Sequence, residues 1–163
     1  MSLVSMLQAV AGAAIRYVVV GGVAARLHGS SRQTDDLDIC YDPEPGNVER
    51  LTALLASWHA YPRGWEPGLP FFMDARTLRT TPTITLRTRQ GDIDLLRRVD
   101  PVGEYAECLA ASTPVPAFGL EIPTLVLPQL IRAKRHANRP KDHLALPELE
   151  AMAVKRGEWP LVG

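Results

Sequence analysis

Two pairs of aspartates, each with one residue between its members, have the type and spacing that could do chemistry. Asp36 and Asp38 lie in the run DDLDICY, and Asp92 and Asp94 lie in the run GDIDLL. Residues two apart on a β-strand point to the same side, so each pair would present two carboxylates together. Such carboxylates repel each other unless a cation lies between them. Because hard divalent ions prefer oxygen ligands, the pattern favours a metal site carrying a phosphate.

A two-ion site for phosphoryl transfer normally takes three carboxylates, which clamp the attacking and leaving oxygens of the reaction. We predict that Asp94 is the third, because Ile93 and Leu95 flank it and it emerges from the middle of an apolar strand. Asp92 follows Gly91 and is expected to meet solvent.

The segment around the first pair predicts a phosphate-binding unit. It reads as a buried strand, a two-glycine turn, a short helix, a polar loop and a second strand, over 17–20, 21–22, 23–28, 30–34 and 36–41. A glycine turn that opens a helix also begins dinucleotide-binding folds. Here the G-x-G-x-x-G spacing fails, because Ala24 and Ala25 stand where glycines are required.

The remaining elements predict a mixed α/β (α+β) fold, a small mixed sheet flanked by helices, in one domain with a core over about 1–118 and a C-terminal helical lobe over about 119–163. A hairpin is expected from 83–88 through Gln90 and Gly91 into 92–96. Asn47 and Thr124 are expected to cap helices. Five further segments are expected as helices over 3–15, 47–58, 102–112, 124–137 and 141–155, an aromatic-packed loop over 61–82 and an irregular strand region over 114–123.

The composition limits which partners and which cell compartment we expect for the protein. The 163 residues include 18 Lys and Arg and 18 Asp and Glu, so any basic surface for a polyanion must be local. Residues 132–141 supply such a cluster, which could equally be a solvated helix face. The sequence shows no signal peptide and no apolar run near the ~18 residues of a membrane span. We therefore expect a cytoplasmic protein with no membrane partner, in which Cys40 is a buried thiol.

Taken together, these motifs resemble the nucleotidyltransferase fold superfamily, and more narrowly the minimal nucleotidyltransferase-like proteins related to the AbiEii toxin family. The resemblance covers about residues 17–146 and is carried by the runs VGGVA, HGSSRQTDDLD, GDIDLL and KRHANRPKD. It implies that Asp36 and Asp38 bind metal and that Asp94 completes the site as general base. The implied cofactor is Mg²⁺, two ions when the nucleoside triphosphate is bound, with Mn²⁺ as a substitute.

The resemblance also implies a nucleotide-binding set. Arg32 is the main expected phosphate contact, because guanidinium is a permanent cation that binds phosphate bidentately. The full set is Gly21, Gly22, Ser30, Arg32, Thr34, Lys134 and Lys141. The chain departs from the family pattern at Gly22, where many members have serine. It also departs at Ala145, which lies near the place of a second acid after the K-D pair, here Lys141 and Asp142.

The implied reaction is transfer of a nucleoside monophosphate from a triphosphate to a hydroxyl. The acceptor is RNA or a protein, as in a toxin–antitoxin system with an antitoxin-like partner, or a small antibiotic; no DNA partner is expected. A non-catalytic nucleotide-binding relative is the alternative, and a dinucleotide-dependent oxidoreductase is a third class.

Three smaller features have structural interpretations that compete with functional ones. His28 is expected to pack or cap rather than act as a base, and a zinc site from His136 and His143 is disfavoured by the proline break between them. Trp65, Phe71 and Phe72 are expected to pack the loop rather than stack on bases.

Overall fold

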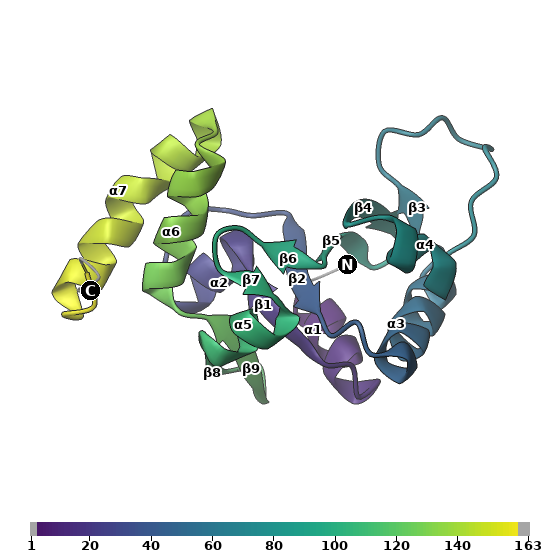
Figure 1. Ribbon diagram of the computed structural model, residues 1–163, viewed down its shortest axis with the longest axis horizontal. Helices are drawn as coiled ribbons and strands as arrows, with labels where there is room; N and C mark the ends of the chain where they lie inside the picture. The colour runs from purple at the N-terminus through teal and green to yellow at the C-terminus, as the bar shows by residue number, and fades with distance from the viewer. Residues whose placement is uncertain (1–2, 160–163) are drawn as a thin grey trace.

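The computed structural model describes residues 3–159, which form a seven-stranded mixed sheet with helices around it (Figure 1). The strand order is β3-β4-β5-β2-β1-β9-β8, with a separate two-stranded ribbon of β6 and β7. The strands are β1 (Tyr17–Val20), β2 (Asp36–Tyr41), β3 (Tyr61–Pro62), β4 (Thr83–Thr88), β5 (Gly91–Leu96), β6 (Arg98–Val99), β7 (Gly103–Glu104), β8 (Ser112–Ala117) and β9 (Leu120–Leu125). The helices are α1 (Leu3–Gly12), α2 (Gly21–Leu27), α3 (Pro45–Ser57), α4 (Ala75–Thr80), α5 (Tyr105–Ala110), α6 (Leu127–Ala137) and α7 (Pro140–Lys155).

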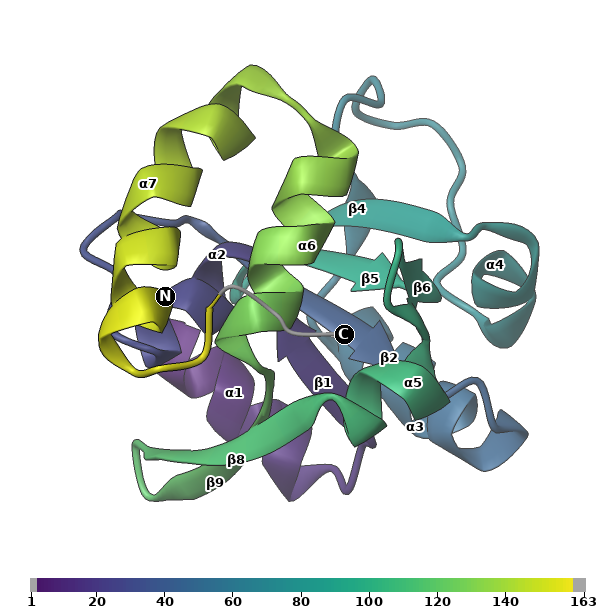
Figure 2. The same ribbon diagram turned by 60° about the vertical axis from the view of Figure 1, so that its left-hand side comes forward.

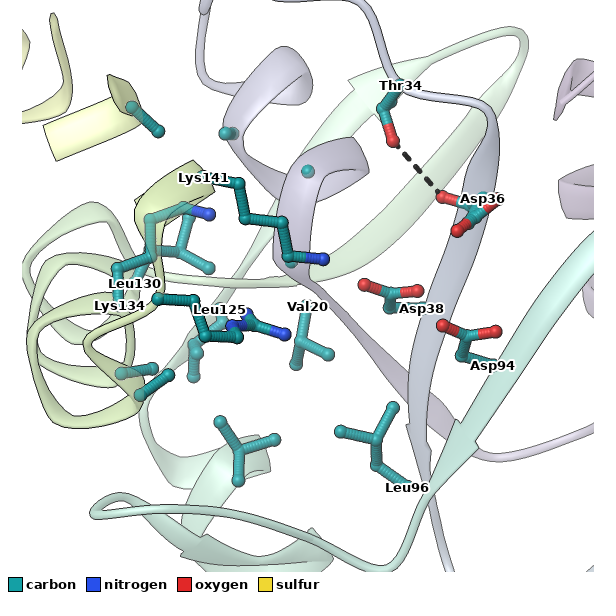
Figure 3. Close-up of a pocket in the computed structure, with 18 of the residues that line it drawn as sticks. Val20, Thr34, Asp36, Asp38, Asp94, Leu96, Leu125, Leu130, Lys134 and Lys141 are labelled. Carbon is teal, nitrogen blue, oxygen red and sulfur yellow. Dashed lines mark hydrogen bonds between the residues drawn. The ribbon is translucent and has the colours of Figure 1, made fainter. Parts of the chain in front are cut away.

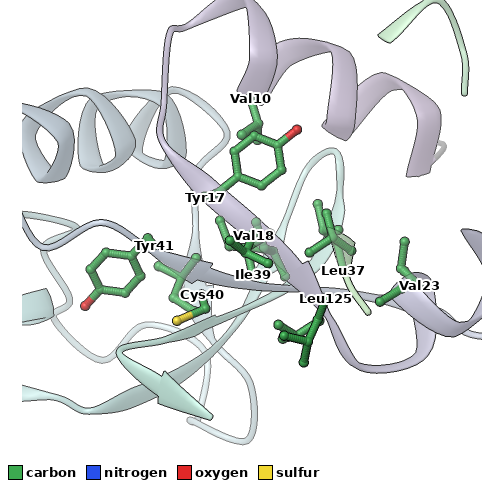
Figure 4. Close-up of a cluster of buried hydrophobic side chains, with 14 of the residues drawn as sticks. Val10, Tyr17, Val18, Val23, Leu37, Ile39, Cys40, Tyr41 and Leu125 are labelled. Atoms are coloured by element: carbon green, nitrogen blue, oxygen red, sulfur yellow. The ribbon is translucent and has the colours of Figure 1, made fainter. Parts of the chain in front are cut away.

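The centre of the sheet is made by the strands that carry the aspartates. β2 pairs antiparallel with β1 and parallel with β5, and β5 pairs antiparallel with β4 as the predicted hairpin. Leu37 and Ile39 of β2 are fully buried, as are the side chains that flank them on β1 (Figure 4). Because side chains alternate along a strand, burial of these two sends Asp36 and Asp38 to the opposite face.

The core is built from apolar side chains of β1, β2 and the helices. Val10 of α1 and Val18 of β1 have no exposed surface, and the Tyr17 ring lies beside Val10 (Figure 4). Cys40 is buried, as predicted, and Cys108 of α5 is buried as well. The mixed α/β class is confirmed. Within residues 3–159 no helix combines the length and the apolar composition needed to cross a membrane.

Two local predictions around the helices were wrong. Gly21 and Gly22 do not form a separate turn, because α2 begins directly at Gly21, which has a φ of +66°. Asn47 is not a cap. The Glu44 carboxylate caps α3 by accepting hydrogen bonds from the backbone amides of Gly46 and Asn47. The buried side-chain amide of Asn47 instead bonds to the backbone N–H and carbonyl of Arg16.

Two further differences come from strand pairing that spacing alone does not reveal. Thr124 lies inside β9, where its hydroxyl donates to the Ile122 carbonyl at 2.8 Å, and α6 begins later. β9 pairs with β1 in the main sheet, so the sheet continues past the boundary expected near residue 118. The expected loop over 61–82 contains β3 and α4, although its middle projects from the sheet (Figure 1).

The C-terminal helices α6 and α7 lie side by side and stand beside the open face of the sheet (Figures 1 and 2). α6 ends at Ala137, as predicted, and α7 begins at Pro140, one residue before the predicted start. Between them Asn138 has the left-handed conformation. This arrangement places a helical wall opposite the carboxylates of β2 and β5.

Candidate active site

The register of β2 and β5 gathers four carboxylates on one face of the sheet. Asp36 is paired with Asp92 and Asp38 with Asp94, and paired residues of neighbouring strands point to the same side. Three of them, Asp36, Asp38 and Asp94, line a cleft of about 570 Å³ (Figure 3). The structure therefore brings the three predicted acids together, and the fourth lies next to them outside the cleft.

Asp38 is the least compensated of these acids. Its Oδ1 is buried and has no hydrogen-bond partner among the described residues. Burial, followed by the nearby Asp94 and Asp36 carboxylates, raises the pKa of Asp38 to about 7. A buried carboxylate oxygen without a partner fits a cation ligand, since a hard divalent ion would replace the missing interaction. Within residues 3–159, no three His, Cys, Asp or Glu side chains are already gathered as a metal-binding group.

The two glycines of α2 make room for the cleft. A Cβ atom at Gly21 would collide with the Asp38 carboxylate, and one at Gly22 would lie 2.8 Å from the Thr34 hydroxyl. The Thr34 hydroxyl donates to the Asp36 carbonyl at 3.4 Å, the bond drawn in Figure 3. The backbone of α2 therefore approaches the acids more closely than any residue with a side chain would allow.

The polar loop 30–34 is held from α7 by one carboxylate that the sequence interpretation missed. Glu148 accepts the Ser30 hydroxyl at 2.5 Å, the Ser31 hydroxyl at 2.5 Å and the Ser31 amide at 3.2 Å. These bonds lower the pKa of Glu148. Ser30 therefore lines the cleft with its hydroxyl already donated, whereas the Arg32 side chain is exposed at the cleft edge.

The wall opposite the acids is basic and comes from α6 and α7. Lys134 and Lys141 line the cleft and extend toward the acids (Figure 3). Lys134 is mostly buried, which lowers its pKa, and its Nζ lies 3.6 Å from Oδ1 of Asp142. Asp142 is fully buried and also accepts from the Arg139 guanidinium at 2.7 Å. The K-D pair noted in the sequence thus contributes one cleft cation and one internal counter-ion.

Arg63 is a second residue that the sequence interpretation missed. Its Nη2 lies 2.5 Å from Oδ1 of Asp94 and 3.8 Å from Oδ2 of Asp36. Burial raises the pKa of Asp36 and the Arg63 guanidinium opposes that rise. No spacing pattern pointed to this residue, because it reaches the acids from a segment assigned to a loop.

Two of the smaller features have structural partners, His28 and the aromatic pair of the loop, whereas the Phe72 side chain is 76% exposed and does not pack the loop as predicted. His28 Nε2 lies 2.8 Å from the Leu125 carbonyl oxygen, and Arg156 of the chain beyond α7 donates to the His28 carbonyl. Burial lowers the pKa of His28. The rings of Trp65 and Phe71 meet edge to face at 5.8 Å, as loop packing predicts.

Comparison with known proteins identifies the architecture. No protein-family profile matches the sequence, and no curated protein matches it. Solved structures do match, among them the antibiotic-resistance factor ANT(2″)-Ia in solution, with 16% identity over 94% of this chain and 84% of that chain and a TM-score of 0.57. The chain has the nucleotidyltransferase fold.

Two further structures with the nucleotidyltransferase fold agree. The crystal structure of ANT(2″)-Ia in complex with adenylyl-2″-tobramycin has 17% identity over 96% of this chain and 91% of that chain, with a TM-score of 0.58. TM1012 from Thermotoga maritima, assigned as a nucleotidyltransferase, has 14% identity over 91% of this chain and 94% of that chain, with a TM-score of 0.55. At these identities the likeness is one of fold, which is the fold that the resemblance of the sequence motifs implied.

Proposed function

We propose that the protein is a metal-dependent nucleotidyltransferase that moves a nucleoside monophosphate from a nucleoside triphosphate to a hydroxyl and releases pyrophosphate. The observation that carries the proposal is the register of β2 and β5, which places Asp36, Asp38 and Asp94 in one cleft opposite Lys134 and Lys141. A binding module without chemistry has no need for three neighbouring carboxylates, which repel one another, and one of them, Asp38, has a buried oxygen without a partner among the described residues.

The acids have distinct roles in this proposal. Asp36 and Asp38 hold Mg²⁺, and Asp38 Oδ1 is suited to this because it is buried without a partner. The ions supply Lewis-acid stabilisation of the charge that develops on the transferred phosphate. Asp94 completes the site and accepts the proton of the attacking hydroxyl, and carboxylates in such positions contribute as general bases.

The basic wall and the polar loop would bind the triphosphate. Arg32 and Lys141 are exposed cations on the cleft edge, and Lys134 reaches the cleft from α6. Gly21 and Gly22 allow the backbone of α2 to approach the ligand closely. Cations on both sides of the acids would hold the phosphates in line for displacement.

The charge of the cleft favours an anionic or neutral acceptor, such as RNA or a protein hydroxyl. Among the described residues that line it, the one carboxylate besides the three acids is Asp100, which is paired with Arg98 at 2.8 Å. The remaining charged lining residues are cations. A polycationic aminoglycoside would find no unpaired carboxylate beyond the metal ligands, and like charges raise the free energy of binding.

Modification of an antibiotic is nevertheless a specific second candidate, because ANT(2″)-Ia has the same fold and was crystallised with an adenylylated aminoglycoside. An uncharged or anionic antibiotic would satisfy both the fold and the charge of the cleft. An AbiEii-like role with a partner protein is the biological setting that we propose for an RNA or protein acceptor.

The test is to incubate the protein with each α-labelled nucleoside triphosphate, Mg²⁺ and one of three acceptor pools: total RNA, lysate protein or an antibiotic panel. We expect label in RNA or protein that requires Mg²⁺ and disappears with Asp94→Asn. Label in an aminoglycoside would overturn the acceptor assignment. Triphosphate binding by calorimetry that is independent of Mg²⁺, with no labelled acceptor, would favour a non-catalytic nucleotide-binding protein.

A further inference from the structure

Arg63 is attached to the sheet at two points before it reaches the acids. Its backbone amide donates to the Thr85 carbonyl at 3.0 Å, and its Nη1 donates to the Leu86 carbonyl at 3.2 Å. Both carbonyls belong to β4, the strand next to β5. The guanidinium is therefore held over the face of the sheet by hydrogen bonds other than its ion pairs.

From this position the guanidinium lies near three of the four carboxylates. Besides Asp94 at 2.5 Å and Asp36 at 3.8 Å, it has Nη1 3.8 Å from Oδ2 of Asp92. Of the four, Asp38 alone has no ion pair with a described residue. Arg63 is also not among the residues that line the cleft, so it contacts Asp94 from outside the cleft.

This arrangement separates the carboxylates into two classes. Arg63 offsets the repulsion among Asp36, Asp92 and Asp94 with a cation that belongs to the protein, and its planar fork orients the carboxylate it binds. Asp38 has no such cation. Because the Arg63 side chain is only 21% exposed, its ion pairs are screened less than those of surface arginines.

We propose that Arg63 is a positioning residue: it fixes the orientation of Asp94 from outside the cleft and acts as a resident counter-cation of the acid cluster, which limits how tightly Mg²⁺ binds. The inference rests on the proposed function for the role of Asp94, but the internal counter-cation is a property of the protein without ligands. Removing the guanidinium should therefore change metal binding and turnover in opposite directions.

The first experiment compares wild-type protein with Arg63→Met, by calorimetric titration with MgCl₂ alone at low ionic strength and by turnover on the labelled acceptor. Loss of one neighbouring positive charge should tighten Mg²⁺ binding about fivefold. Loss of orientation of Asp94 should lower kcat about 10- to 100-fold. A purely structural arginine would weaken both, and that result would overturn the proposal.

Two matched variants separate charge from geometry. Arg63→Lys keeps the charge without the planar fork, so Mg²⁺ affinity should stay within about twofold of wild type while kcat still falls. Arg87→Met is the control, because Arg87 lies on β4, its side chain is 75% exposed and its one ion pair among the described residues is with Asp92, at 3.9 Å. It should leave both quantities within about twofold. Equal changes in Mg²⁺ affinity and kcat at Arg63 and Arg87 would show a non-specific electrostatic effect of positive charge and would overturn the positioning role.

A third measurement does not depend on transfer activity or metal binding. In EDTA, Arg63→Met should lower the midpoint of urea unfolding in the wild-type background, and the shift should shrink by at least half in an Asp94→Asn background, because the pair couples. Equal shifts of the urea midpoint in both backgrounds would overturn the role of Arg63 as a counter-cation of Asp94. If the cycle shows coupling and no acceptor is ever labelled, the proposed function fails while the role of Arg63 stands.

Discussion

The cleft has an acidic wall, made by β2 and β5, and a basic wall, made by α6 and α7, and the buried charges of the two walls are compensated differently. On the basic wall, Lys134 faces its own counter-ion, the fully buried Asp142, which Arg139 also binds. On the acidic wall, Asp38 has a buried oxygen without a partner, and Arg63 compensates only its neighbours. The buried charges of the basic wall are therefore compensated without a ligand, whereas the acidic wall has one buried carboxylate oxygen without a partner among the described residues. Under the proposed function, the acidic wall carries the chemistry and the basic wall positions the substrate.

The largest expected effect comes from breaking the acidic wall at the proposed base. Asp94→Asn should lower the rate of nucleotidyl transfer about 10²- to 10⁴-fold, because an amide cannot accept the proton. The control is Asp92→Asn, on the same strand and face but outside the cleft. It should retain the rate within about threefold. Single-turnover release of labelled pyrophosphate measures both, and equal losses would remove the distinction between the two aspartates.

Breaking the basic wall should affect stability first. Asp142→Ala removes the counter-ion of Lys134 and the N-terminal cap of α7, and loss of one partner of a buried ion pair costs about 3–5 kcal/mol. Glu150→Gln on the same helix is the control, because Glu150 pairs with the half-exposed Arg135 and should cost less than about 1 kcal/mol. Urea unfolding with coincident fluorescence and circular dichroism gives both values. A small effect at Asp142 would mean that this wall is not internally compensated.

The uncompensated position predicts a pH dependence of stability. The pKa of Asp38 is about 7 in the folded protein and 3.8 in the unfolded chain. Between these values the folded state binds one more proton, so the free energy of unfolding falls as pH rises, by up to about 1.4 kcal/mol per pH unit. The contribution of Asp38 to this loss is complete above pH 7.

Asp38→Asn isolates this contribution, because asparagine does not titrate. Measured in EDTA, the variant should become more stable relative to wild type as pH rises from 5 to 8. Added Mg²⁺ should restore the stability of the wild type at pH 8 and leave the variant unchanged. Parallel pH profiles for the two proteins would show that Asp38 is already compensated in the folded state.

The smallest expected effect concerns the link between the walls. Glu148→Gln weakens the bonds from α7 to Ser30 and Ser31, so the loop 30–34 should exchange its amide hydrogens faster. The KM for the triphosphate should rise about threefold, with kcat unchanged, because Arg32 loses its fixed position. Glu148→Asp should recover part of the protection. Unchanged exchange in Glu148→Gln would show that the loop is held by other contacts.

The acidic wall was largely readable from the sequence. Alternation within DDLDICY and GDIDLL predicted Leu37 and Ile39 in the core and the aspartates on the opposite face. The Gln90-Gly91 turn predicted the β4–β5 hairpin. These signals are local and repeat every two residues, so they do not depend on how distant parts of the chain pack.

The elements that were wrong depend on partners far away in the chain. Thr124 has the character of a helix cap, but pairing of β9 with β1 makes it a strand residue. Asn47 also has the character of a cap, yet it is buried against the backbone of Arg16. In both cases tertiary contacts outweigh a local preference worth about 1 kcal/mol.

What the sequence by itself determined is therefore the set of carboxylates, their common face and the nucleotidyltransferase fold that presents them. Only the tertiary structure decided how their charges are compensated. Arg63 and Glu148 reach the site across 31 and 118 residues of chain, from the turn after the edge strand β3 and from the last helix. The physical reason is that side-chain direction along a strand is a local property, whereas the position of a counter-ion depends on how distant segments pack.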